Sequence, residues 1–270
     1  MTIKFIKDLN DDEVSHFKKS NIYSIINKNW CTTDSFIKYN SEYFKARYFD
    51  YSLVVFEKTT FFIAMVSYSK DNTLSFFGEA LNIYELNDNS ANLNLAYNIL
   101  YKKILSFKKE FNFSKLYFSN NEKFLSKFFE NSFSNLLDYQ MYIDLSQPED
   151  LIKMNLRKSF KSLVNWGSTN LQIEVISSNN ANKTKFNDFK DFHIKISGKK
   201  TRNDETWNLQ FEALMKNEAY LVLGYLENQL VSGTYVAHGS EIAYYGVAVN
   251  DRELMSKKIP IGHAVLYNSI

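Results

Sequence analysis

The chain has 270 residues, of which 45% are hydrophobic and 16% aromatic, so it can bury enough apolar surface to fold and is not intrinsically disordered. Its 32 basic and 30 acidic side chains give a net charge of +2, which excludes a chain-wide field directed at nucleic acid or a membrane. A single cysteine, Cys31, excludes an intrachain disulfide, and the first residues lack the apolar core of a signal peptide. We therefore expect a cytoplasmic protein without a transmembrane segment.

The first half of the chain alternates helical and strand patterns. The expected elements are a strand at 3–6, helices at 9–27 and 34–47, strands at 52–57, 61–67 and 74–77, a helix at 92–109, a strand at 115–119, a helix at 122–131 and a strand at 137–145. This order predicts a mixed sheet with helices on both faces.

Strand patterning stops at Ser146–Asp150, so we expect two domains, at 1–146 and 147–270. The second half is expected to contain helices at 151–166, 186–196 and 206–216, strands at 171–176, 220–226, 230–237 and 242–249, a charged loop at 250–258 and a helix from 264. Short polar turns join the last three strands, which indicates an antiparallel meander.

Four segments of the second half carry a family resemblance: LIKMNLRKSFKSLVNWG, HIKISGKKTRNDETWNLQ, EAYLVLGYLENQLVSGTYVAHGSEIAYYGVAVNDRE and PIGHAVLYNSI. Two helices, three antiparallel strands and a helix is the element order of GNAT acyltransferases, and the chain resembles the FemAB family, which has two such halves. The resemblance implies an α/β fold (α+β, mixed sheet) with two tandem GNAT-like domains. Because the sequence stops within the last helix, the second domain is incomplete at its C-terminus, and we expect a fragment; an abbreviated second domain is the alternative.

FemAB-like proteins are similar to enzymes that acylate an amine, the best known of which use aminoacyl-tRNA to extend a peptidoglycan precursor peptide. The resemblance implies acyl or aminoacyl transfer to a small metabolite, a sugar-nucleotide or a glycan or peptide precursor of the cell wall. The resemblance leaves two acyl donors open: aminoacyl-tRNA, in which case tRNA is a partner, and acyl-CoA. NDRELMSKKIPIGH has only Gly262 where GNAT enzymes have a glycine-rich phosphate loop. We expect no bound cofactor and no DNA partner.

Acyl transfer to an amine needs a route for the proton of the amine and donors directed at the oxyanion. His263, beside Gly262 at a helix start, and Tyr245, at the end of a strand, are the catalytic candidates, together with backbone N–H groups of residues 261–264. A helix-capping histidine and a core tyrosine are the alternatives. Since neighbouring strand residues point to opposite faces, we expect either Tyr244 or Tyr245 to be core.

The substrate-binding candidates are Lys199, Lys200, Arg202, Trp207, Arg252 and Gly262. The first three lie close together in HIKISGKKTR and would clamp a phosphate or carboxylate group of the substrate. The alternatives are a solvated turn for the basic residues, a packing role for Trp207 and a loop ion pair for Arg252.

The sequence lacks the motifs that indicate a metal site or an enzyme nucleophile. The four histidines are scattered without metal-ligand spacing, so we expect no metal site. Without a Gly-x-Ser-x-Gly motif, direct attack by the amine is favoured over an enzyme nucleophile. Two alternatives stay open: a non-catalytic binding protein for a nucleotide-sugar or peptide precursor, or an inactive fragment; and an RNA-binding protein that uses the basic helix at 151–166.

Overall fold

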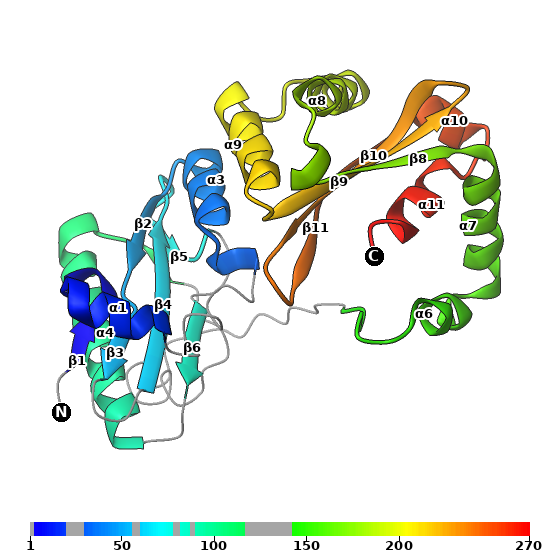
Figure 1. Ribbon diagram of the computed structural model, residues 1–270. Helices are drawn as coiled ribbons and strands as arrows, with labels where there is room; N and C mark the ends of the chain where they lie inside the picture. Colours follow the sequence, from blue (N-terminus) through cyan, green and yellow to red (C-terminus); the bar gives the residue numbers. More distant parts are fainter. Residues whose placement is uncertain (1–2, 20–29, 56–59, 78–81, 87–89, 117–141) are drawn as a thin grey trace. The chain divides into compact units, whose positions relative to one another are not determined.

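The computed structural model describes residues 3–19, 30–55, 60–77, 82–86, 90–116 and 142–270 (Figure 1). Its contacts divide the chain into two compact units, one of Met1–Ile26 and Asn40–Leu137 and the other of Asn27–Tyr39 and Asp138–Ile270. The second unit thus includes a segment from the N-terminal part of the chain. The expected domain bounds of 1–146 and 147–270 stay a prediction. Within the described ranges, no helix combines the length and the apolar character needed to cross a bilayer.

The first unit contains a mixed sheet, as the sequence predicts. Its strands are β1 Ile3–Phe5, β2 Arg47–Asp50, β3 Leu53–Val55, β4 Thr60–Tyr68, β5 Thr73–Ser75, β6 Asn82–Leu86 and β7 Lys115–Leu116, and its helices are η1 Ile6–Asp8, α1 Asp11–Lys19 and α4 Ser90–Phe111. The long strand β4 pairs antiparallel with β2, β3, β5 and β6, whereas β5 and β7 are parallel. Strands β2 and β6 were not expected.

Some expected elements of this half fall outside the described residues. These are the end of the first helix, the helix at 122–131 and most of the strand at 137–145. The last residues of that strand, 142–145, are described and do not form a strand.

Helix α4 forms the core of the first unit with β4. Leu100, Ile104 and Phe107 recur at helical spacing and are buried in one cluster with Ala64 and Val66 of β4. The period of the apolar residues therefore determines which side of α4 faces the sheet.

The second unit is built on a four-stranded antiparallel sheet in the order β11-β10-β9-β8. Its elements are η2 Trp30–Thr32, α6 Glu149–Asn155, α7 Lys158–Asn170, β8 Gln172–Ile176, η3 Ser178–Asn180, α8 Lys183–Ser197, α9 Asp204–Met215, β9 Ala219–Leu226, β10 Gln229–His238, β11 Ala243–Asn250, α10 Arg252–Ser256 and α11 Ile261–Tyr267. Helix α3, Asp34–Phe44, crosses the boundary between the units, with its residues up to Tyr39 in the second. Strands β9 to β11 confirm the expected meander.

Helices cover both faces of this sheet (Figure 1). Leu221 and Leu223 of β9 are buried in a cluster with α8 and α9, whereas Val222 between them is buried with Ile261 and Val265 of α11. Successive residues of a strand point to opposite faces, so one strand serves two cores. We refer to these as the α8/α9 face and the α7/α11 face.

Two expectations for the second half are wrong in detail. The single helix expected at 151–166 is interrupted at Leu156, which has an extended backbone with φ −63° and ψ 145°, and therefore forms α6 and α7. The expected loop at 250–258 contains the short helix α10, because the Asp251 side chain accepts hydrogen bonds from the N–H groups of Glu253 and Leu254.

Strand β11 contains a bulge that decides where its tyrosines point. Tyr235 of β10 pairs with Val247, but the next residue, Val236, pairs with Tyr245, so Gly246 is an extra residue in β11. The bulge reverses the alternation on its far side. Tyr245 therefore shares the face of Val236, and Tyr244 lies on the other face.

Close packing of α7 on α11 gives a first prediction. A Cβ atom at Gly167 would lie 2.4 Å from the Cβ of Ala264, a distance at which the helices must separate. We expect Gly167→Ala to lower the free energy of unfolding by about 1–3 kcal/mol in chemical denaturation. Asn165→Ala, at an exposed position of α7, should have little effect, and Gly167→Ala/Ala264→Gly should recover part of the loss. An unchanged stability in Gly167→Ala would contradict this packing.

Candidate functional site

Arg202 lies in the short connection between α8 and α9, and both ends of that connection are fixed. Gly198 ends α8 with φ 70°, a left-handed conformation that glycine adopts without strain, and its N–H donates to carbonyls of the last helical turn. Asn203 then begins α9, because its side chain accepts a hydrogen bond of 2.9 Å from the Thr206 N–H. Arg202 is thus held directly before a capped helix.

Contacts from two helices surround the Arg202 guanidinium. Its Nη1 donates a hydrogen bond of 2.8 Å to the Tyr39 hydroxyl on α3 and lies 3.5 Å from Oε1 of Gln210 on α9. Its central carbon lies 4.7 Å from the centre of the Trp207 ring, at cation–π distance. Since Trp207 is only 1% exposed, the guanidinium is bound against the edge of the core.

Two further side chains complete this group. The Tyr235 hydroxyl donates to the backbone carbonyl of Gln210 at 3.0 Å, and burial raises the pKa of Tyr235 far above its usual range. The His193 ring lies 5.4 Å from that of Trp207, and burial, with the nearby Arg202 charge, lowers its pKa, so this histidine is neutral at pH 7. We call Tyr39, His193, Arg202, Trp207, Gln210 and Tyr235 the Arg202 cluster.

The Arg202 cluster contains buried polar atoms without partners. Among the described residues, His193 Nδ1 and Trp207 Nε1 are buried and have no hydrogen-bond partner. Buried polar atoms are nearly always paired, with protein, ordered water or ligand. A guanidinium beside unsatisfied nitrogen atoms is suited to binding an anionic group such as a carboxylate or phosphate.

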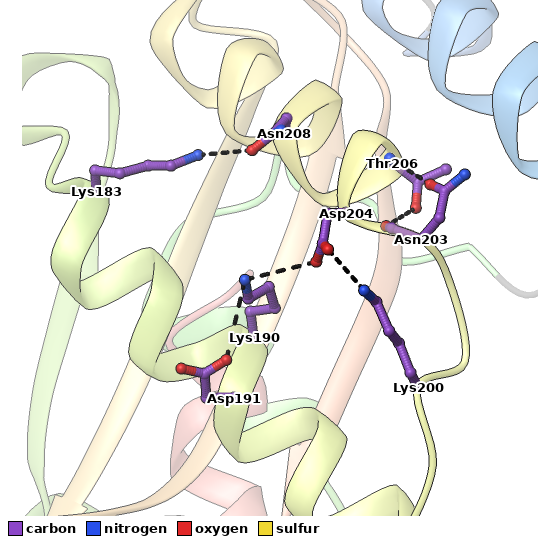
Figure 2. A network of polar contacts seen from close by, with 8 residues as sticks. All are labelled: Lys183, Lys190, Asp191, Lys200, Asn203, Asp204, Thr206 and Asn208. Atoms are coloured by element: carbon purple, nitrogen blue, oxygen red, sulfur yellow. Dashed lines mark hydrogen bonds and ion pairs between the residues drawn. The ribbon is translucent and has the colours of Figure 1, made fainter.

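The structure does not bring the expected three cations together. Lys200 donates to Asp204 at 2.6 Å, and Lys190 lies 3.8 Å from the same carboxylate, as Figure 2 shows. The hydrogen bond from Lys200 lowers the pKa of Asp204, which therefore stays ionised. Lys199 is exposed. Of the predicted substrate-binding residues, Arg202 and Trp207 lie together, and Lys200 forms a surface ion pair instead.

Tyr244 and Tyr245 lie on opposite faces of the sheet, as expected, but neither is core. They are 48% and 49% exposed, respectively. On the α8/α9 face, Tyr244 stacks on Trp30 of η2 with ring centres 4.2 Å apart and an interplanar angle of 10°. On the α7/α11 face, burial raises the pKa of Tyr245, and a hydrogen bond with the Thr234 side chain partly offsets this effect.

His263 and Gly262 lie on α11 and therefore on the opposite face of the sheet from the Arg202 cluster. The His263 ring packs edge-on against Phe160 of α7, with ring centres 5.1 Å apart, and its Nδ1 is buried without a partner among the described residues. A Cβ at Gly262 would lie 2.7 Å from Oδ1 of Asn250, so glycine leaves room for that side chain. The Ile261 N–H donates to the Ile259 carbonyl at 3.0 Å and is not directed at a ligand.

Arg252 is exposed in the first turn of α10 and is not part of the Arg202 cluster. The predicted site residues thus divide into Arg202 with Trp207 on one face of the sheet, Tyr245 with Gly262 and His263 on the other, and Lys199, Lys200 and Arg252 at the surface.

Sequence reasoning missed Tyr39, Gln210 and Tyr235. Tyr39 is 163 residues from Arg202, so no local spacing connects them. Gln210 follows Trp207 by almost one helical turn and could have been found by placing both on one side of α9. Tyr235 has the pattern of an ordinary core residue of β10.

No group of three or more His, Cys, Asp or Glu side chains that could hold a metal ion occurs in the part of the chain that the structure describes. Cys31 is buried in η2.

Comparisons with known proteins identify the class of fold. The whole chain superposes on 85% of the crystal structure of FemX with a TM-score of 0.58 and 11% sequence identity. It also superposes on 87% of a conserved protein of unknown function from Bacteroides thetaiotaomicron, with a TM-score of 0.56 and 15% identity. No protein-family model matches the sequence, and no curated protein matches it. The chain thus has a FemX-like fold, and the resemblance to the FemAB family is confirmed at the level of the fold.

Burial of Tyr235 predicts a loss of stability at alkaline pH. Its pKa in the folded state is raised above the unfolded value of about 10, so its contribution is complete below pH 10 and is lost as the pH rises further. At about pH 11 we expect the wild type to have lost about 1.4 kcal/mol more than Tyr235→Phe, measured by urea unfolding from pH 8 upward. Exposed Tyr142→Phe should behave as the wild type. If the free energies of unfolding of wild type and Tyr235→Phe changed in parallel with pH, the Tyr235 hydroxyl would ionise as readily in the folded as in the unfolded protein.

Proposed function

We propose that this protein transfers an acyl or aminoacyl group to an amine of a small metabolite, sugar-nucleotide or cell-wall precursor. The neutral amine attacks the carbonyl carbon of an activated ester or thioester, the bond to the leaving oxygen or sulfur breaks, and the proton of the amine passes to the leaving group or to solvent. The observation that carries the proposal is the Arg202 guanidinium, held by Tyr39 and Trp207 within a FemX-like fold.

In this proposal, the Arg202 cluster binds an anionic group of the acceptor. A guanidinium presents a planar fork of donors that matches a carboxylate or phosphate, and its partial burial strengthens such a pair. The neutral His193 adds no competing charge, and the Nε1 of Trp207, which has no partner among the described residues, is a further donor. Lys200 has no part in it, because Asp204 already neutralises its charge.

The exposed end of β11 is the proposed place of reaction. Among the described strands, β11 pairs only with β10, and its residues 243–246 are exposed. Both faces of the sheet meet at this edge, so an acceptor held on the α8/α9 face and a donor on the α7/α11 face can reach each other there. Tyr245 would line the donor side at this end of the strand, and Gly262 and His263, near Asn250 at its other end, would contact a more distant part of the donor on the same face. An activity assay with both donors distinguishes between aminoacyl-tRNA and acyl-CoA.

In the proposed mechanism, Tyr245 donates a hydrogen bond to the developing oxyanion. Its raised pKa keeps the hydroxyl protonated at neutral pH, which suits a donor and excludes a general base.

The function is tested by incubating the protein with alanyl-tRNA or acetyl-CoA and a panel of amines that includes a nucleotide-sugar-linked cell-wall precursor peptide. Mass spectrometry should detect an acylated amine. We expect Arg202→Ala to lower kcat/KM by about 10- to 100-fold, because charge-assisted hydrogen bonds to the acceptor are lost.

Arg157→Ala is the matched control, since Arg157 is exposed at the start of α7, and it should retain the activity within about twofold. Equal activity of Arg202→Ala and wild type would contradict the assignment of the Arg202 cluster to the acceptor site. Binding of a precursor without any acylated product from either donor would favour a non-catalytic binding protein.

Removal of the Tyr245 hydroxyl tests the donor side separately. Tyr245→Phe should lower kcat by about 100-fold with little change in the KM of the acceptor, because the lost hydrogen bond forms mainly in the transition state. Tyr225→Phe, which removes another partly buried hydroxyl of the same sheet, should leave kcat within about twofold. A tenfold rise in KM without a fall in kcat would instead give Tyr245 a role in substrate binding.

A further inference from the structure

The hydrogen bond between Tyr39 and Arg202 joins parts of the chain that are 163 residues apart. Arg202, Trp207 and Gln210 all belong to α9 or to the connection that precedes it, so their contacts are local. Tyr39 belongs to α3, and the compact unit that contains Arg202 also includes this end of α3. The tyrosine is therefore a contact from outside α9 that restrains the guanidinium.

The segment that carries Tyr39 is itself anchored in the second unit. Trp30 stacks on Tyr244 of β11, and Phe36 packs edge-on against the same Trp30 ring, with ring centres 4.2 Å apart and planes at 90°. The Thr33 hydroxyl donates to the Trp30 carbonyl at 2.9 Å and accepts from the Phe36 N–H at 3.2 Å. Helix α3 thus starts from a fixed point on β11.

These restraints act on different parts of the guanidinium. Tyr39 and Gln210 contact Nη1, whereas the central carbon of the guanidinium lies 4.7 Å from the centre of the Trp207 ring. A cation–π contact attracts the charge of the guanidinium but selects none of its N–H groups, so it does not fix their direction. The hydrogen bond from Nη1 to the Tyr39 hydroxyl opposes rotation of the group and gives the fork of donors one direction.

We infer that Tyr39 is a positioning residue that orients the Arg202 guanidinium, through its hydroxyl, toward the anionic group of the acceptor. The role given to Arg202 here rests on the proposed function, whereas the orientation itself is independent of it. In this role Tyr39 acts on the acceptor through Arg202, so its loss should weaken acceptor binding and leave the reacting groups unchanged.

The orientation is tested without a substrate by 15N NMR of arginine side chains. The sequence contains four arginines, so the spectrum is simple, and Arg202→Lys assigns the signal of Arg202 by its absence. We expect slow rotation of the Arg202 guanidinium in the wild type and in Tyr267→Phe, whose hydroxyl contacts Glu149 instead. Tyr39→Phe should at least double the rotation rate and leave the melting temperature close to that of Tyr267→Phe. An unchanged rotation rate in Tyr39→Phe would overturn the inference.

The consequence for binding is tested by calorimetric titration with inorganic pyrophosphate as the anionic probe. Tyr39→Phe should weaken binding by about tenfold, and Arg202→Lys by at least as much, because lysine lacks the planar fork. In the Arg202→Lys background, Tyr39→Phe should add less than about twofold, since the hydroxyl acts through the guanidinium. Equal losses from Tyr39→Phe in both backgrounds would overturn the positioning role.

The two proposals fail in different ways. A faster rotation in Tyr39→Phe, together with pyrophosphate binding that is absent or indifferent to Arg202→Lys, would support the orienting contact and contradict the anion site of the proposed function. An unchanged rotation, together with binding lost in Arg202→Lys, would support the anion site and overturn the role of Tyr39.

Discussion

The two-residue alternation of side chains along β9 and β10 is the constraint on which the second compact unit depends. Leu221 and Leu223 pack with α8 and α9, and Val222 packs with α11. Both layers must be present, because either face left uncovered would expose a row of buried aliphatic side chains. The same alternation separates the candidate residues, with Arg202 and Trp207 above one face and His263 and Tyr245 on the other. A site that uses both sets has to lie at an edge of the sheet.

Electrostatics distinguish the basic residues of the α8–α9 connection. Lys200 carries a compact charge and has an acidic partner, Asp204, four residues along the chain. The neighbours of Arg202 include a phenol, an amide and an indole ring. A guanidinium tolerates such surroundings because its charge is delocalised and weakly hydrated. Residue type and neighbours therefore distinguish the two cations: Lys200 is an ammonium paired at the surface, and Arg202 is a guanidinium held against the edge of the core.

The sequence allowed the local features of the fold to be predicted and few of the distant ones. The meander β9–β11 follows from apolar runs and polar turns, and α4 from its apolar period. The break at Leu156 has no glycine or proline to announce it, and β2 and β6 are too short for a clear pattern. Trp207 could be recognised as a candidate because it lies at the start of an expected helix. Tyr39 and Tyr235 could not be recognised in this way, because their roles depend on contacts with residues that are far away in the sequence.

The interleaving of the chain between its two compact units has a consequence for synthesis. Residues 27–39 leave the ribosome long before β11 and the α8–α9 connection, with which Trp30 and Tyr39 make their contacts. Residues 27–39 are therefore made before these partners, which follow only after more than half of the chain has been synthesised. Because closing so long a loop costs entropy, the contacts form late in folding. Arg202 thus gains its hydrogen bond with Tyr39 only when the α8–α9 connection meets a segment that was synthesised much earlier.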